Sequence, residues 1–204
     1  MLHLSQDPDA DALLSKDPLA LLLGMALDQQ IPMEKAFRGP QLLMERLGHL
    51  DAARIAALDP GEFAAVMATP PAVHRFPGSM AKRLQDLCVV VADDYGNDAS
   101  ALWTGAASGA DLLQRVTALP GFGDQKARIF VALLGKQLAV RPRGWRQAAG
   151  AYGQNGVTQS VADVTGPDSL LAVQAHKQAA KKAARAVAPA DQACPALVGG
   201  RTMR

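Results

Sequence analysis

Apolar side chains recur along the chain at helical spacing, in runs separated by proline and glycine. Asp17-Pro18 is typical of a helix start, and the apolar run after it predicts a helix from residue 19 to residue 29 or 30, ended by Ile31-Pro32. The same pattern predicts further helices over 33–38, 41–47, 53–58, 60–68, 80–94, 111–118, 124–138 and about 167–186. No segment alternates apolar and polar side chains as a half-buried strand does. The pattern therefore predicts an all-α fold.

Composition divides the chain into three parts. Residues 1–16 form an acidic N-terminal segment, 17–186 hold the predicted helices, and 187–204 are expected to be a disordered tail. A length of 204 residues is enough for one domain or for two small lobes that share a cleft. For residues 17–186 we expect two helical lobes around a basic cleft.

Charge is distributed unevenly, although the net charge is only +2. Residues 115–146 carry seven bases and one acid, whereas the first 17 residues carry four acids and one base. The basic region predicts a surface that faces an anionic partner, with a solvated helix face as the alternative interpretation. For a second basic run, from Lys177 to Arg185, the pattern favours a solvated helix over weak phosphate binding.

The two cysteines, Cys88 and Cys194, lie far apart and outside any C-x-x-C pair. The sequence therefore predicts no structural zinc, no iron–sulfur cluster and no metal bound through side chains. Cys88 lies in an apolar run and is expected to be a buried free thiol. The acidic N-terminus is unlike a signal peptide, and the longest apolar run, 18–27, is too short to span a bilayer. We expect a cytoplasmic protein with no membrane association.

The most specific feature is the segment Leu119-Pro120-Gly121-Phe122-Gly123 between two predicted helices. Two glycines separated by one residue allow a tight turn whose N–H groups can approach a phosphate closely. The start of the next helix adds unpaired N–H groups and the positive end of its dipole. Phe122 can pack between the two helices, and Ala127 is small enough to let them approach. The pattern favours a sequence-independent phosphate clamp over a plain corner between helices.

Together with the apolar helix beyond it, this segment resembles the helix–hairpin–helix motif of the endonuclease III and 3-methyladenine DNA glycosylase II (HhH-GPD) superfamily. Two more segments occur in the superfamily's order. Leu27-Asp28-Gln29-Gln30-Ile31 is similar to its Gln-Gln turn, with an exposed helix end as the alternative. Residues 76–84 are similar to the loop and helix before the hairpin, although Lys82-Arg83 there favours a solvated helix face. The resemblance implies a nucleoid-associated base-excision DNA repair protein that binds double-stranded DNA as a monomer.

The resemblance also implies roles for individual residues. The phosphates would be gripped by Gly121, Phe122, Gly123, Gln125 and Lys126. Gln30 would probe the minor groove or fill the gap left by a flipped base. A monovalent cation at the hairpin carbonyls is compatible with the resemblance, which implies no other cofactor here because the cysteines of the superfamily's iron–sulfur loop are missing.

The chain departs from the superfamily at the residues that carry its chemistry. The catalytic Asp should follow the hairpin, but no Asp or Glu occurs between Gln125 and Ala162, and bases occupy the expected region. A cation there would oppose the positive charge that develops on the sugar. The catalytic Lys of bifunctional members falls on Gln125, and Lys126 is turned from that position by about 100°. Lyase activity is therefore disfavoured. The remaining candidates for a catalytic carboxylate, with capping or solvated roles as the alternative, are Asp163, Asp28 and Glu34.

The sequence leaves three functions open. The first is a monofunctional DNA N-glycosylase, a hydrolase that removes a damaged or mismatched base. The second is a non-catalytic DNA-binding protein that recognises damage, which the missing carboxylate favours. The third is a helical protein-interaction module in which the hairpin is only a corner, and this function predicts no salt-sensitive DNA affinity.

Overall fold

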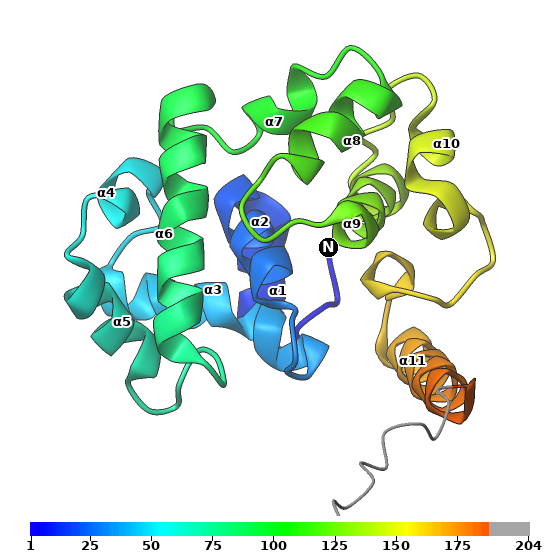
Figure 1. Cartoon of the computed structure of the whole chain (residues 1–204), viewed down its shortest axis with the longest axis horizontal. Coiled ribbons are helices and arrows are strands. Elements are labelled where there is room, and N and C mark those ends of the chain that lie inside the picture. The colour runs from blue at the N-terminus through cyan, green and yellow to red at the C-terminus, as the bar shows by residue number, and fades with distance from the viewer. Residues whose placement is uncertain (188–204) are drawn as a thin grey trace, which may run out of the picture.

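The computed structural model describes residues 1–187, so the predicted tail lies, from residue 188 on, outside the described residues. Residues 1–187 contain helices and loops but no strand, which confirms the all-α fold (Figure 1). The elements are α1 (Pro8–Lys16), α2 (Pro18–Leu27), α3 (Met33–Leu47), α4 (Ala52–Ala56), α5 (Pro60–Ala68), α6 (Pro77–Asp94), α7 (Ala101–Thr104), α8 (Gly109–Thr117), α9 (Asp124–Gln137), α10 (Trp145–Ala149), the 3₁₀ helices η1 (Gly150–Gly153) and η2 (Val161–Asp163), and α11 (Pro167–Val187).

The helices pack in two groups that share one core (Figure 1). In the first group α2 packs on α3, and α6 packs on α4 and α5. In the second group α9 contacts α8, α10, η1 and η2, and α11 follows on η2. Within the first group α2 also lies beside α6, and the two groups meet where a side chain of α9 reaches the end of α2. Because their buried apolar side chains form one continuous cluster, packing fixes how the groups sit relative to each other.

Helix α2 is the central element of this core. The Asp17 carboxylate accepts two N–H groups of its first turn, and Pro18 occupies the first helical position. Every residue from Leu19 to Leu27 is buried, as expected for a helix that is apolar on all sides. Neither α2 nor any other helix within residues 1–187 has the length and apolar character needed to cross a membrane. Helix α2 ends at Leu27, so the predicted extension to residue 29 or 30 does not form.

Helix α3 runs through Gly39 and Pro40 without a break, so the prediction of two helices, over 33–38 and 41–47, is wrong. A proline inside a helix removes one N–H donor and disfavours helical backbone at the preceding residue. Gly39 occupies that preceding position and packs so closely on α2 that a Cβ would lie 2.5 Å from Cδ1 of Leu27. Burial of the apolar face of α3 therefore outweighs the local cost of the proline.

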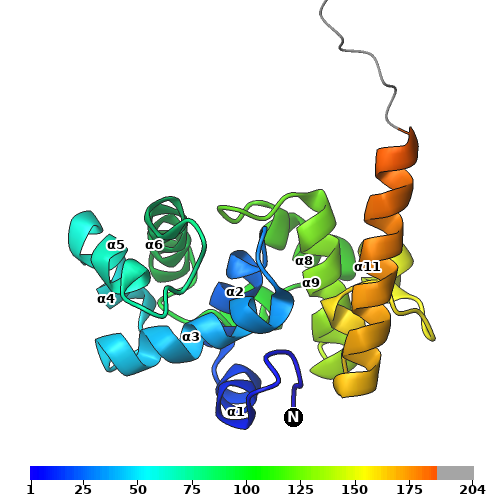
Figure 2. The same cartoon turned by 90° about the horizontal axis from the view of Figure 1, so that it is seen from below.

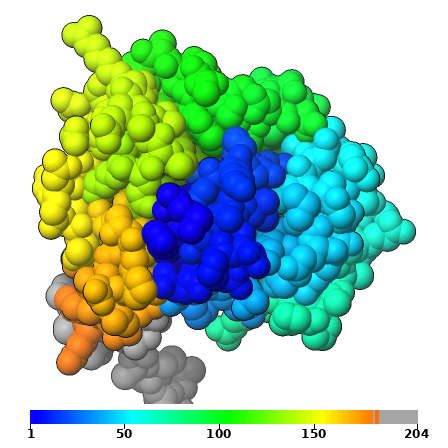
Figure 3. Space-filling model, turned by 180° about the vertical axis from the view of Figure 1, so that it is seen from behind, coloured from blue at the N-terminus to red at the C-terminus, as the bar shows by residue number. Residues whose placement is uncertain are grey.

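The N-terminal segment belongs to the same core. Leu2 and Leu4 are buried, and α1, which the sequence does not predict, packs on α2 and α3. The buried Asp11 carboxylate accepts the N–H groups of Leu4 and Ser5 and ties the segment to α1. Figure 3 shows this blue segment in the middle of the back face, between the cyan helices and the C-terminal helices. The boundary predicted at residue 17 therefore does not separate a structural unit.

Four short elements, α7, α10, η1 and η2, are not predicted by the sequence because so few residues show no helical periodicity. Helix α10 begins at Trp145, in a segment for which the sequence predicts no helix. It forms because Trp145 is buried against α9, where Gly135 leaves room for the indole. A Cβ on Gly135 would lie only 2.3 Å from Cε3 of Trp145. Tertiary packing thus stabilises a helix that local sequence does not specify.

Candidate nucleic-acid interface

The hairpin between α8 and α9, residues 119–123, closes as a tight turn. Gly121 has a φ of +83°, and Gly123 precedes α9 in an extended conformation. Both glycines are exposed, and a Cβ on Gly123 would meet no atom within 4 Å. No described side chain caps α9, so the N–H groups of its first turn are open to an outside acceptor. The hairpin therefore presents backbone donors and the positive end of the α9 dipole on an open surface.

Phe122 holds the hairpin from the inside. Its side chain is 4% exposed, and its ring packs edge-on against Phe130 of α9 at a centroid distance of 5.9 Å. The Phe122 N–H donates to the Leu119 carbonyl at 3.1 Å and closes the turn. Ala127 is buried on the first turns of α9, where the sequence predicts close helix packing. The Phe122 side chain thus shapes the hairpin from the core, while the glycines form its outer surface.

The α2–α3 loop, residues 28–32, lies beside the hairpin (Figures 1 and 2). Two side chains from other elements hold its Gln29. The Nε2 atom of His74 lies 2.8 Å from the Gln29 carbonyl oxygen, and Arg83 donates to the Gln29 side-chain oxygen at 2.6 Å. Because the other His74 ring nitrogen accepts a backbone N–H, Nε2 carries the proton and donates. The Arg83 stem also covers Gly121, so this residue joins the loop to the hairpin.

Gln30 stands at the tip of the α2–α3 loop. It is exposed and has a φ of +56°, a left-handed conformation that costs about 1–2 kcal/mol for a residue with a Cβ. Backbone strain of this kind persists where the surrounding structure imposes it, and it is frequent at binding sites. The anchored Gln29 next to it provides that constraint. Gln30, for which the resemblance predicts a contact in the minor groove, therefore lies at the exposed tip of this loop.

Lys126 points into the protein instead of across the hairpin surface. Its ammonium group donates to the carbonyls of Met25 and Ala26 at 3.0 and 3.1 Å, at the end of α2. It also lies 5.7 Å from the centre of the Phe122 ring. Lys126 thus caps the C-terminus of α2 and ties the two helix groups together. A phosphate contact is not needed to explain its position, and that contact stays a prediction.

The position of Lys126 makes protein stability depend on pH. Burial lowers the pKa of Lys126 from 10.5 to about 8, with nearby Asp28 opposing the shift and Arg83 adding to it. Between these two pH values the unfolded chain binds more protons than the folded one, so this group makes the free energy of unfolding rise with pH. We expect Lys126→Met to remove that rise. Urea unfolding of both proteins below, within and above this pH range measures the difference, and parallel pH profiles would contradict the buried placement.

Gln125 and Tyr152 form a pair on the outer side of the hairpin. The exposed Gln125 donates its amide to the half-buried Tyr152 hydroxyl in η1, at 2.9 Å. Sequence reasoning missed Tyr152 and His74, and it favoured a solvated position for Arg83. A lone tyrosine in a glycine-rich segment and a histidine in a loop are the only signals, and neither indicates its partner before the fold is known.

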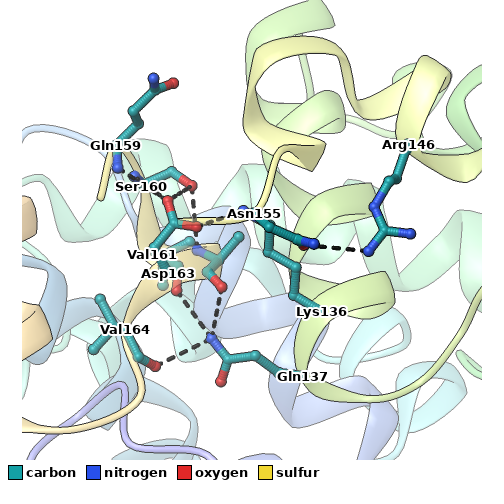
Figure 4. Close-up of polar contacts among 10 residues, drawn as sticks. Lys136, Gln137, Arg146, Asn155, Gln159, Ser160, Val161, Asp163 and Val164 are labelled. Carbon is teal, nitrogen blue, oxygen red and sulfur yellow. Dashed lines mark hydrogen bonds and ion pairs between the residues drawn. The ribbon is translucent and has the colours of Figure 1, made fainter. Parts of the chain in front are cut away.

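Asp163 is the first acidic residue after α9, and its carboxylate bonds to neighbouring groups that stabilise the local structure (Figure 4). One carboxylate oxygen pairs with Nζ of Lys136 at 2.5 Å, and the other accepts the N–H groups of Gln159 and Ser160 in a capping box. The Asp163 side chain is only 4% exposed. Lys136 lies in the last turn of α9, roughly 18 Å along the helix from the hairpin. The structure therefore does not bring Asp163 to the hairpin.

The other two candidate carboxylates contact α11. Glu34 accepts a hydrogen bond from Gln174, and the Asp28 carboxylate lies 4.0 Å from Nζ of Lys177. The Asp28 side chain is 17% exposed, and its negative charge opposes the lowering of the Lys126 pKa by burial. Asp28 is the candidate acid that belongs to the α2–α3 loop, so it is the one that the structure places beside the hairpin.

We call this surface the hairpin face: the exposed glycines of the hairpin, Gln30 at the loop tip, and the Gln125–Tyr152 pair. An exposed aromatic residue, Phe76, lies two residues from His74, with the Arg75 guanidinium 5.2 Å from its ring centre. Backbone N–H groups can bind anionic oxygen atoms, and an exposed aromatic ring can stack on a base. The arrangement can therefore hold a polyanion and present polar and aromatic side chains beside it.

Comparison with known proteins finds no match to this chain among family models, curated proteins or solved structures.

Proposed function

We propose that this protein binds duplex DNA in base-excision repair, in the manner of a helix–hairpin–helix DNA glycosylase with two helical lobes around a basic cleft. The observation that carries this proposal is the hairpin. A left-handed Gly121, an open Gly123 and an uncapped α9 expose backbone donors, while the buried Phe122 keeps their geometry. Donors of this kind bind phosphate without reading sequence.

Recognition of an altered base would come from the α2–α3 loop. Gln30 is exposed at a strained tip, beside donors that would hold the DNA backbone. A side chain held in this way can enter a base stack that is already weakened, since unstacking costs least at a damaged or mismatched base. The proposed preference is therefore for a duplex with a local defect over an intact one.

Base excision is the second candidate function, and the position of Asp28 favours it. Asp28 lies in the α2–α3 loop beside the hairpin, whereas Asp163 and Glu34 are engaged elsewhere. A carboxylate at that place can stabilise the cationic sugar that develops when the N-glycosidic bond breaks. Oligonucleotides with uracil, hypoxanthine, 3-methyladenine-type and 8-oxoguanine lesions, treated with hot alkali after incubation, test it. A break lost in Asp28→Asn would establish excision, and no break at any lesion leaves DNA binding as the function for those substrates.

Gly123→Val tests the hairpin directly. A Cβ at this position meets no protein atom within 4 Å and the backbone is extended, so the variant is expected to fold normally. The added isopropyl group would keep phosphates away from the first turn of α9. We expect duplex affinity to fall about tenfold, with a shallower dependence on salt because fewer counterions are released. Fluorescence anisotropy of a labelled duplex at several salt concentrations measures both quantities.

Gly166→Val is the matched control, because Gly166 also has open space at its Cβ position and lies at the start of α11, away from the hairpin. Its affinity should equal that of the unmodified protein. If the unmodified protein shows no salt-sensitive duplex binding, or if Gly123→Val binds as tightly as the control, the proposed function is wrong.

A further inference from the structure

Helix α11 has two parts with different surroundings. Up to Gln174 it packs on the rest of the protein: Leu170 and Val173 are buried, and Gln174 bonds to Glu34. From Ala175 onward, every residue whose burial is described is exposed. Figure 2 shows this second part extending beyond the body of the protein, on the side where the hairpin lies. We call residues 175–187 the projecting half of α11.

The projecting half carries only positive charge. It contains Lys177, Lys181, Lys182 and Arg185 and no Asp or Glu. Like charges three or four residues apart on a helix repel each other, and a helix of this length without tertiary packing is marginally stable in water. An anionic partner would relieve the repulsion and stabilise the helix.

The root of the projecting half lies at the α2–α3 loop. The ammonium group of Lys177 is 4.0 Å from the carboxylate of Asp28, which belongs to the α2–α3 loop. The helix therefore leaves the protein beside the start of the α2–α3 loop. At 1.5 Å per residue the projecting half is about 20 Å long, which matches roughly six base pairs of duplex.

We propose that the projecting half of α11 lies along the phosphate backbone of the same duplex that the hairpin holds, on the side of the α2–α3 loop away from the hairpin. This inference rests on the proposed function. It assigns the partner of a basic helix for which the sequence favours a solvated surface, and it extends the DNA footprint beyond the lesion site in one direction.

The chemistry of the helix favours a nucleic-acid backbone over a lipid surface. Helices that lie in a membrane interface carry bulky apolar side chains, such as Leu, Phe or Trp, opposite their charged face. Residues 175–187 have alanine and glutamine at most of their uncharged positions. Such a helix gains little from insertion among lipid chains, whereas ion pairing with phosphates needs no apolar face.

A double variant, Lys181→Gln with Lys182→Gln, tests the proposal in the full chain. We expect duplex affinity to fall roughly 5- to 10-fold at moderate salt, and the slope of log affinity against log salt to decrease by about 1–2, since two phosphate contacts are lost. The matched control is Lys16→Gln with Arg54→Gln, which removes two exposed bases from α1 and α4. A duplex too short to reach α11 should bind the unmodified protein and the Lys181/Lys182 variant equally, whereas a longer duplex should separate them.

The outcomes distinguish this inference from the proposed function. If the unmodified protein binds duplex and Gly123→Val weakens it, but the Lys181/Lys182 variant and its control behave alike, α11 does not contact DNA and the proposed function stands. If the unmodified protein shows no salt-sensitive binding, the proposed function fails and this inference fails with it. If the Lys181/Lys182 variant loses binding to anionic phosphatidylserine vesicles but not to DNA, the partner of α11 is a lipid surface and the inference is overturned.

Discussion

Phe122→Ala is expected to lower the free energy of unfolding by about 3–5 kcal/mol. The Phe122 ring is 4% exposed and packs on Phe130, so its removal leaves a cavity between α8 and α9. The hairpin would then keep one buried side chain, Leu119, beside its two glycines, so its shape would be less firmly fixed. DNA affinity should therefore fall even under conditions where the variant is almost fully folded. Equilibrium urea unfolding measures the first effect, and anisotropy at low temperature measures the second.

Phe63→Ala separates these two effects. Phe63 is fully buried on α5, in the first helix group, so its loss should cost a similar amount of stability. It does not contact the hairpin, and the folded variant should bind DNA as the unmodified protein does. Equal DNA affinity in the two variants would mean that Phe122 stabilises the core without shaping a DNA contact. A stability loss below about 1 kcal/mol for Phe122→Ala would contradict the packing itself.

Asp163→Asn is expected to lower the free energy of unfolding by about 3 kcal/mol, because it leaves the largely buried Lys136 ammonium without its partner. The amide group also places donors where the carboxylate accepted the N–H groups of the capping box. Thermal unfolding at neutral pH measures the loss. A loss of stability of this size is what a structural role predicts, whereas a catalytic carboxylate could be replaced with little cost to folding.

A double-mutant cycle with Lys136→Met checks that the ion pair is the cause. The double variant should cost less than the sum of the two single variants, since each removes the same interaction. Asp168→Asn is the matched control: this residue is an exposed acid in the first turn of α11, and its replacement should change stability by less than about 0.5 kcal/mol. Additive effects of Asp163→Asn and Lys136→Met would show that the pair contributes nothing.

The parts of the fold that the sequence predicts are those specified by neighbouring residues. Helix α2 begins at a capping Asp and a Pro, and the turn of the hairpin needs a glycine at the left-handed position 121, so both are visible locally. Helix α3 is different, because its Gly39-Pro40 pair predicts a break that burial against Leu27 overrides. The short helix α10 likewise depends on the contact between Trp145 and Gly135, and the sequence gives no indication of that contact.

The candidate site also combines features specified by neighbouring residues with features that depend on contacts between distant elements. The exposed backbone of the hairpin and the exposed position of Gln30 agree with the expectations from the sequence. The direction of a long side chain depends on the element it meets, and Lys126 turns toward α2 because α2 ends beside it. The partner of Asp163 also lies in another element, since Lys136 is near the far end of α9.

The burial of α2 has a mechanical consequence for the proposed function. The loop at its end is attached to a helix that cannot shift without disturbing the whole core. His74 and Arg83 hold Gln29 of the loop, and Lys126 holds the end of the helix. Because the α2–α3 loop is held in this way, we expect it to change little on binding, so the DNA has to deform instead. Sites that bend or unstack at low cost are then bound more tightly than rigid ones. The affinity of the protein would then depend on local DNA flexibility, and many chemically different lesions make DNA more flexible.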